Sequence, residues 1–313
     1  MNTSLSITKI LLFILFYFPL LSSIAPVNAQ VGNITNLNFG INNSYPWIQS
    51  VCGDVRVDNG ITNKAPLGQS TLTTNPTCTT PGILFIGNGS TNFGQGQAST
   101  NNQIVGGTTY PEVYTPSSAG GIFSSYTYLL QKAQSSGLEI INLSTICTLA
   151  NCTLPNNLQK GIYLANSDVN LNTHTFNNND NYIFLINGNL TLKGDVLTPV
   201  SSTAIFSVSG NIIVLPTVGS PTNATTPNIS GIFSADKALI LPSNNNCTDL
   251  RLNIEGAIIV NASRSGSQFQ NNRDLCTDNG TYPSVHITQR LDFILNLPDI
   301  MKIHNYISQE VAP

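Results

Sequence analysis

Charge is scarce in this chain. Lys, Arg, Asp and Glu together make up only 9% of its 313 residues, against roughly 25% in an average soluble domain. The net charge of −3 excludes a protein that binds nucleic acid by neutralising phosphates, because such proteins need a basic surface. The hydrophobic share of 41% excludes a chain that is disordered through low hydrophobicity and high net charge.

Familiar catalytic and metal-binding patterns are lacking as well. The three His are scattered and no two Cys form a C-x-x-C pair, so a zinc site is not expected. The chain contains no G-x-S-x-G, no H-E-x-x-H and no phosphate-binding loop. We therefore expect no metal, no cofactor and no catalytic residues.

The few acidic residues leave one enzymatic alternative open. Asp168 and Asp195 fall at different positions of the repeat described below, so they do not predict a stacked carboxylate pair. Asp274 and Asp278, beside Arg273, would need a defined separation across a cleft to act on a polysaccharide. A salt-bridged loop around them is the simpler interpretation.

Long apolar runs are limited to the N-terminus. Lys9 precedes an apolar stretch over residues 10–21, and Val27 and Ala29 stand at the −3 and −1 positions before Gln30. This order is typical of a secretory signal peptide. The stretch is shorter than the roughly 20 residues that span a membrane, although a retained anchor is an alternative. We expect residues 1–29 to be removed, and the mature chain to be secreted, or held at the cell envelope, and not membrane-spanning.

The cysteines agree with export. An even number of Cys in an exported chain favours disulfides over free buried thiols. We expect neighbours in the sequence to pair, which joins Cys52 to Cys78, Cys147 to Cys152 and Cys247 to Cys276.

Asn is abundant, with 40 in the chain, and the middle of the chain repeats. Residues 182–192 match 204–214 at an offset of 22, and a step of 21 backwards reaches 162–164 and 168–171. Steps of 27 and then 19 forwards reach 239–241 and 258–260. Such spacing around a strand–turn–strand unit indicates a solenoid.

The repeat predicts an all-β fold, a parallel β-helix with about 20–22 residues per rung. Alternate strand residues should form one buried stripe, because a single rung cannot bury its apolar face alone. A β-sandwich with hairpins is the alternative. The stripe comprises Val169, Leu171, Leu190, Leu192, Ile212, Val214, Leu239, Leu241, Ile258 and Val260.

One helix should interrupt the strands, over residues 122–136, packed along the solenoid or across its end. Its apolar residues recur every three to four positions, Ser124 or Ser125 can cap its start, and Gly137 can end it. We expect one domain over residues 30–313. It comprises a loop-rich part (30–120) with strands near 52–57 and 82–87, the helix, core rungs (160–262) and a closing strand (285–297).

Two resemblances accompany these patterns. Motifs at 45–49, 53–55, 187–191, 272–275 and 309–313 resemble those of uncharacterised exported proteins of candidate-phylum (Patescibacteria-type) bacteria, over nearly the whole mature chain. The resemblance brings no established activity.

The order of a Gly-Asp-Val strand at 53–55, the helix, Gly161-Ile162-Tyr163 and the rung at 183–188 is similar to that of the bacterial ice-binding family. This resemblance implies a discontinuous β-solenoid with a helix alongside. Regular Thr-x-Thr ranks are not found; Thr173-His174-Thr175 stands alone.

The function expected from these observations is that of a structural or adhesive surface protein without catalytic activity. Its partners would be surface glycans, envelope proteins or partner cells. Trp47 and Tyr45 are possible ligand contacts, since an exposed ring can stack on a sugar, although a buried role for Trp47 is the simpler interpretation. Ice binding is the alternative function, and a polysaccharide-active enzyme is the second.

Overall fold

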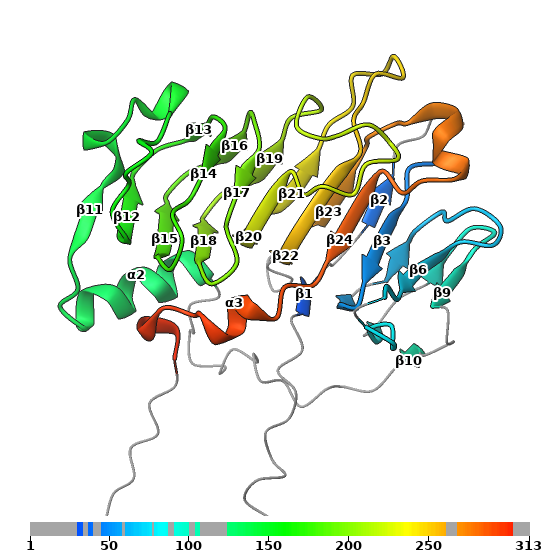
Figure 1. The fold of residues 1–313 in the computed structure, drawn as a ribbon, viewed down its shortest axis with the longest axis horizontal. Coiled ribbons are helices and arrows are strands. Elements are labelled where there is room, and N and C mark those ends of the chain that lie inside the picture. Colours follow the sequence, from blue (N-terminus) through cyan, green and yellow to red (C-terminus); the bar gives the residue numbers. More distant parts are fainter. Residues whose placement is uncertain are drawn as a thin grey trace, which may run out of the picture.

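The computed structural model describes residues 30–33, 37–39, 45–57, 60–76, 78–86, 91–99, 104–106, 124–260 and 268–302. The expected signal peptide lies outside these residues. Within them, all pairs between named strands are parallel, and successive rungs stack into a β-solenoid (Figure 1). The expected fold class is therefore confirmed.

The largest sheet, here called the long sheet, has 12 strands and runs the length of the solenoid. Ten of them follow one path from β11 to β9, and β14 and β17 pair beside it. In order along the sheet they are β11 (Ile140–Asn142), β12 (Gly161–Ala165), β15 (Asn181–Ile186), β18 (Thr203–Val208), β20 (Ile229–Ala235), β22 (Leu252–Val260), β24 (Val285–Thr288), β3 (Ile48–Val51), β6 (Ser70–Thr73) and β9 (Gln97–Ser99), with β14 (His174–Thr175) and β17 (Val196–Leu197).

Three smaller sheets complete the rungs. The six-stranded one, here called the narrow sheet, contains β13 (Val169–Leu171), β16 (Leu190–Leu192), β19 (Ile212–Val214), β21 (Ala238–Leu241), β23 (Gln268–Asn271) and β2 (Leu37–Phe39). The others contain β1 (Gln30–Asn33), β4 (Asp54–Val57), β7 (Leu84–Ile86) and β10 (Ile104–Gly106), and β5 (Ile61–Thr62) with β8 (Thr91–Asn92).

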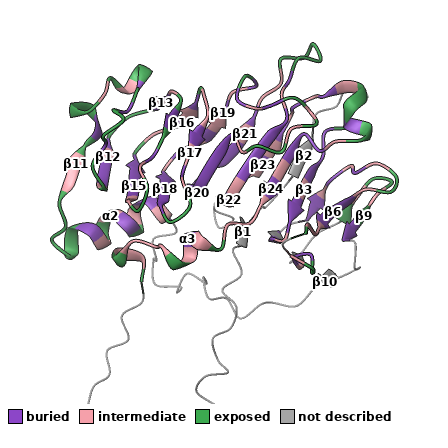
Figure 2. Cartoon of the chain, viewed as in Figure 1, coloured by how far each residue is buried: buried purple, intermediate pink, exposed green. Residues whose placement is uncertain are grey.

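The core lies between the long and narrow sheets, whose strands are mostly buried in Figure 2. Along each strand, side chains point alternately into and away from this core. All ten residues of the expected stripe are buried. Aromatic rings of the long sheet form a column behind them. Tyr163, Phe184, Phe206 and Phe233 stack on successive rungs with ring centroids 4.9–5.2 Å apart.

The register of the repeat is confirmed for the first steps and wrong for the last. Ile183 pairs with Ile205, and Ile212 with Leu239, as the offsets of 22 and 27 predicted. Residues 258–260 lie on β22 of the long sheet, and the true neighbour of β21 is β23. The step of 19 joined a strand of the narrow sheet to one of the long sheet, whereas the true step, from Leu239 to Phe269, is 30 residues because β22 lies between them in the sequence.

The ends of the stack also differ from the expectation. The predicted closing strand at 285–297 is strand only over β24, which lies inside the long sheet between β22 and β3. The chain then turns into the short helix α3 (Asp292–Leu295). The strands expected near 52–57 and 82–87 appear as β4 and β7, and the N-terminal part extends the solenoid beyond the last C-terminal strand. The solenoid is therefore discontinuous in sequence.

Helix α2 (Ser125–Ser135) lies along the outside of the long sheet, as expected, beneath the ends of β15 and β18 in Figure 1. Its buried residues Tyr126, Leu129 and Ala133 pack on outward-facing aliphatic residues of β12, β15 and β18. Ser124 caps it by accepting the N–H of Thr127 at 3.0 Å. Four 3₁₀ segments complete the described structure: η2 (Leu143–Thr145), η3 (Leu149–Asn151), η4 (Cys276–Gly280) and η5 (Asp299–Met301).

A buried carboxylate fixes the start of this helix. Asp236 accepts the backbone N–H of Ser125 at 3.1 Å and the hydroxyl of Ser124, where the helix dipole favours a negative charge. The hydroxyl of Ser125 lies 2.7 Å from those of both Ser207 and Ser234. These bonds set the position of α2 over β18 and β20.

The aromatic column predicts a large stability effect at its centre. Phe206→Ala should lower the free energy of unfolding by about 3–5 kcal/mol, because it removes a ring stacked on both sides and leaves a cavity. Chemical denaturation followed by circular dichroism measures the loss. Phe206→Leu, which keeps most of the volume, should cost clearly less; equal losses would show that the column is not close-packed.

Candidate functional site

The outer side of the narrow sheet is the best candidate for a binding surface. Each strand triplet there has two inward residues around one that is partly exposed. We call the five outward residues the open face. They are Asn170, Thr191, Ile213, Ile240 and Gln270.

The open face is regular and uncharged. Neighbouring rungs of a sheet lie about 4.8 Å apart, so five rungs give a row about 19 Å long. Because each residue is partly exposed between two buried neighbours, its backbone is held by the core on either side. The row is therefore rigid, and it presents amides, one hydroxyl and two aliphatic side chains.

The corner beside the open face is held by stacked Asp and Asn side chains. Asp168 accepts the N–H of Asn189 at 2.7 Å, Asn189 accepts the N–H of Asn211 at 2.9 Å, and Asn211 accepts the N–H of Ala238 at 3.1 Å. The backbone N–H and the side-chain amide of Asn189 hold the pKa of Asp168 below its usual value. A Cβ at Gly188 would lie 2.7 Å from the backbone of Asp168, so only glycine permits this approach of the rungs.

The outer side of the long sheet has the opposite character. Its outward residues at the same rungs, Ile162, Ile183, Leu185 and Ile205, are buried beneath α2. Leu297 and Ile300, from the segment after α3, pack against the same cluster. The outer side of the long sheet is therefore covered by other elements, whereas the narrow sheet leaves its central residues partly exposed.

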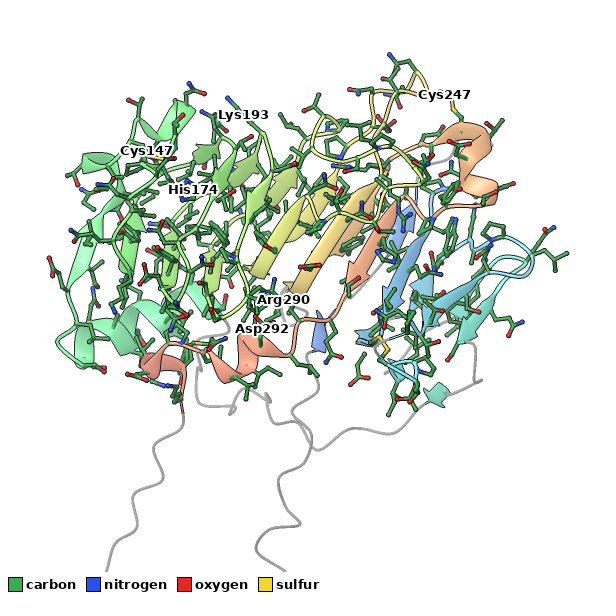
Figure 3. All side chains as sticks on the ribbon, viewed as in Figure 1. Cys147, His174, Lys193, Cys247, Arg290 and Asp292 are labelled. Carbon is green, nitrogen blue, oxygen red and sulfur yellow. A yellow bond between two sulfur atoms is a disulfide. The ribbon has the colours of Figure 1, made fainter. Side chains whose placement is uncertain are left out.

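The disulfides cross-link the corners of the solenoid. They join Cys52 to Cys78, Cys147 to Cys152 and Cys247 to Cys276, the pairs of neighbours that the sequence suggested. Cys152 also begins the narrow sheet, because its N–H donates to Asn170 O at 2.7 Å. The smallest ring thus stabilises the first rung of the open face, near the Cys147 label in Figure 3.

Trp47 and Tyr45, the possible ligand contacts, differ widely in exposed fraction. Trp47 is 0% exposed, and its indole N–H donates to Asn279 O at 2.9 Å. This burial leaves Trp47 no surface with which to contact a ligand and corrects that hypothesis. Tyr45 is 51% exposed, with the Lys64 ammonium 4.7 Å from its ring, and remains a predicted contact.

Arg273 and the acids near it hold insertion loops together. Arg273 is fully buried, and its guanidinium donates to Val218 O, Leu250 O and Leu215 O at 2.7–2.8 Å. Burial lowers its pKa to about 10. Asp274 accepts Cys276 N–H at 2.7 Å. These groups satisfy local backbone atoms, which is a structural role.

The other acids do not join them. Asp278 accepts the hydroxyl of Thr222 at 2.9 Å, and Asp195 lies 3.5 Å from the Asn228 amide, with its pKa raised by burial. Asp168 belongs to the corner described above. No group of three or more His, Cys, Asp or Glu in the described part of the chain is placed to hold a metal ion.

The lone Thr-x-Thr motif brackets a buried histidine. Thr173 and Thr175 are exposed, whereas His174 points into the solenoid and packs edge-on against Phe176 at 4.7 Å. Burial lowers the pKa of His174, and its Nε2 has no partner. Burial therefore favours the neutral imidazole; Figure 3 labels His174 among the strands.

Sequence reasoning missed the open face because no residue type repeats along it. A search for Thr ranks could not find a row of Asn, Thr, Ile, Ile and Gln. The available signal was positional: the middle residue of each apolar-x-apolar triplet in the repeat must point outward.

Comparisons with known proteins give a distant likeness in fold. The DUF3494 domain of Shewanella frigidimarina ice-binding protein 1 is similar at 14% identity, over 84% of this chain and 93% of that domain, with a TM-score of 0.35. A scan of protein-family models gives no match, and neither does a search of curated proteins. In the described part of the chain, no helix combines the length and apolarity needed to cross a membrane.

The environment of His286 predicts that the stability of the protein depends on pH. Burial, with the nearby charge of Arg251, lowers the pKa of His286 to about 4, while the unfolded value is about 6.5. Between these values the unfolded chain binds more protons. Stability is therefore full above pH 6.5, falls as the pH drops and levels off near pH 4, a loss of about 2–3 kcal/mol.

Denaturation midpoints at pH 7 and pH 4.5 measure this effect. His286→Gln should remove a pH-dependent loss of that size, while the contribution of the carboxylates stays. An unchanged slope in His286→Gln would show that the imidazole titrates normally in the folded protein.

Proposed function

We propose that this chain is a non-catalytic, secreted or cell-surface binding protein whose open face contacts an extended, uncharged surface. The observation that carries the proposal is the row of five uncharged, partly exposed residues at constant spacing on a rigid sheet. Rigid residues lose little conformational entropy on binding, so many weak contacts can add up.

Surface glycans of an envelope or of partner cells are the first candidate ligand. The amides of Asn170 and Gln270 and the hydroxyl of Thr191 can bond to sugar hydroxyls, and Ile213 and Ile240 can contact the apolar faces of sugar rings. A neutral polysaccharide offers both kinds of group at regular intervals. The three disulfides suit such an exported role.

Ice is the second candidate, favoured by the centre of the same row. Thr191, Ile213 and Ile240 are consecutive along the sheet and combine a hydroxyl with aliphatic groups. A flat, uncharged row of this kind suits a regular solid surface. Both candidates use the open face, so one pair of substitutions tests them.

A glycan array with labelled mature protein tests the first candidate. We expect retention of neutral polysaccharides by the wild type and a loss of at least tenfold in Thr191→Lys/Ile213→Lys, because two charges disrupt contact with a neutral surface. Gln134→Lys, on the exposed side of α2, is the matched control and should bind normally. Absence of binding to every glycan, or equal binding by all three proteins, would contradict this use of the face.

An ice-recrystallisation assay tests the second candidate. If ice is the ligand, micromolar wild-type protein and Gln134→Lys keep ice grains small, while Thr191→Lys/Ile213→Lys allows them to coarsen. Circular dichroism shows whether the double variant remains folded. Wild-type grains that coarsen as in buffer would remove ice from consideration.

A further inference from the structure

A second polar site lies on the other sheet, where α2 does not reach. Arg251 and Asn253 stand two residues apart and face away from the core, since Leu252 between them is buried inside. His286 on β24 pairs with Asn253, so its side chain lies beside that of Asn253 on the same face. The three groups are here called the Arg251 site.

The Arg251 site is covered by one loop. Arg251 Nη1 donates to Thr222 O at 3.0 Å, and Asn253 Nδ2 donates to Ala224 O at 3.1 Å. Both side chains are at least nine-tenths buried, with 5% and 2% exposure. His286 is partly exposed, so it forms the rim of the site.

Arg251 differs from the other arginines whose side chains the structure describes. Arg290 pairs with Asp292 at 2.6 Å and with Glu255 at 3.2 Å. Arg273 bonds to several carbonyls and has Asp249 nearby. Among the described residues, Arg251 has no carboxylate partner, and its Nε, like that of Arg273, is buried without a hydrogen bond. A buried cation in this state is costly, and an anion would relieve the cost.

Asn253 adds the opposite requirement, a hydrogen-bond donor. Its Oδ1 is buried and unpartnered, so it needs a donor. A ligand that satisfies both residues must carry an anionic group for Arg251 and, about 6–7 Å away along the strand, a hydroxyl for Asn253. Because both unbonded atoms are buried, the ligand must also displace the loop whose Thr222 and Ala224 carbonyls cover them. The acids nearby have other partners: Glu255 on the same strand accepts from Arg290, and Asp278 accepts the hydroxyl of Thr222, whose carbonyl bonds to Arg251.

We propose that Arg251, Asn253 and His286 bind an acidic sugar, with the carboxylate of a hexuronate on Arg251 and one of its hydroxyls on Asn253 Oδ1. His286 lies at the rim, where its imidazole can bond to a second hydroxyl. A simple anion satisfies only half of the site, and a neutral sugar satisfies only the other half. This site is separate from the open face and does not depend on the function proposed for it.

Calorimetric titration of the mature protein with glucuronate, glucose and inorganic sulfate tests the proposal. Glucuronate should bind at least tenfold more tightly than either of the others, and it should shift the His286 imidazole resonances in NMR spectra. Arg251→Gln should lose this binding by at least tenfold. Lys193→Gln, an exposed cation on another corner, is the matched control and should keep it.

A second variant tests the proposal independently, in case Arg251→Gln fails to fold. Asn253→Asp is nearly isosteric and supplies Arg251 with an internal carboxylate, so it should abolish glucuronate binding while the protein stays folded by circular dichroism. Thr191→Lys/Ile213→Lys should bind glucuronate normally, which separates failure at this site from failure at the open face. Sulfate binding as tight as glucuronate, no binding by the wild type, or binding retained in Asn253→Asp would overturn the proposal.

Discussion

Backbone pairing between successive parallel rungs is the interaction on which the rest of this structure depends. A rung has too few residues to bury its own apolar face, so each needs a neighbour on both sides. The most demanding junction is that between β24 and β3, which joins the two ends of the sequence. Trp47 supports it from within: its carbonyl accepts the Ser284 N–H at 3.0 Å, and its indole bonds to Asn279 O. The single tryptophan therefore stabilises a junction and has no exposed surface.

The outward residues of each rung then decide what each side of the solenoid does. Where they are aliphatic, as at Ile183 and Ile205, the side is stable only when covered, and α2 provides the cover. Where they are a mixture of Asn, Thr, Ile and Gln, the side tolerates water. The same parallel stack thus generates a covered face and an open face from a difference at one position per rung, and the candidate binding surface follows from that difference.

The sequence predicted those features that depend on local spacing. The register of residues 182–192 over 204–214, the helix with its Ser124 cap, and the pairing of neighbouring cysteines all follow from short-range patterns. Residues 258–260 were misplaced because a repeat of variable length carries no fixed offset. Residues 285–297 were wrongly expected to close the stack because the pairing of β24 with β3 joins segments that are distant in sequence. The Arg251 site could not be foreseen, since its members meet only through the pairing of β22 with β24.

The scarcity of charge acquires a physical explanation in this arrangement. Like charges on stacked rungs would repel at about 4.8 Å, and the corner of Asp168, Asn189 and Asn211 accordingly has one acid followed by amides. The three described guanidiniums lie where insertions interrupt the stack and leave carbonyls without a strand partner. The guanidiniums of Arg273 and Arg290 each donate hydrogen bonds to more than one such carbonyl. These bonds replace the strand pairing that the insertions interrupt. Arg251 collects one, that of Thr222. Arg251 therefore has neither several carbonyls nor, among the described residues, a carboxylate partner, and this difference is the reason for assigning it a ligand.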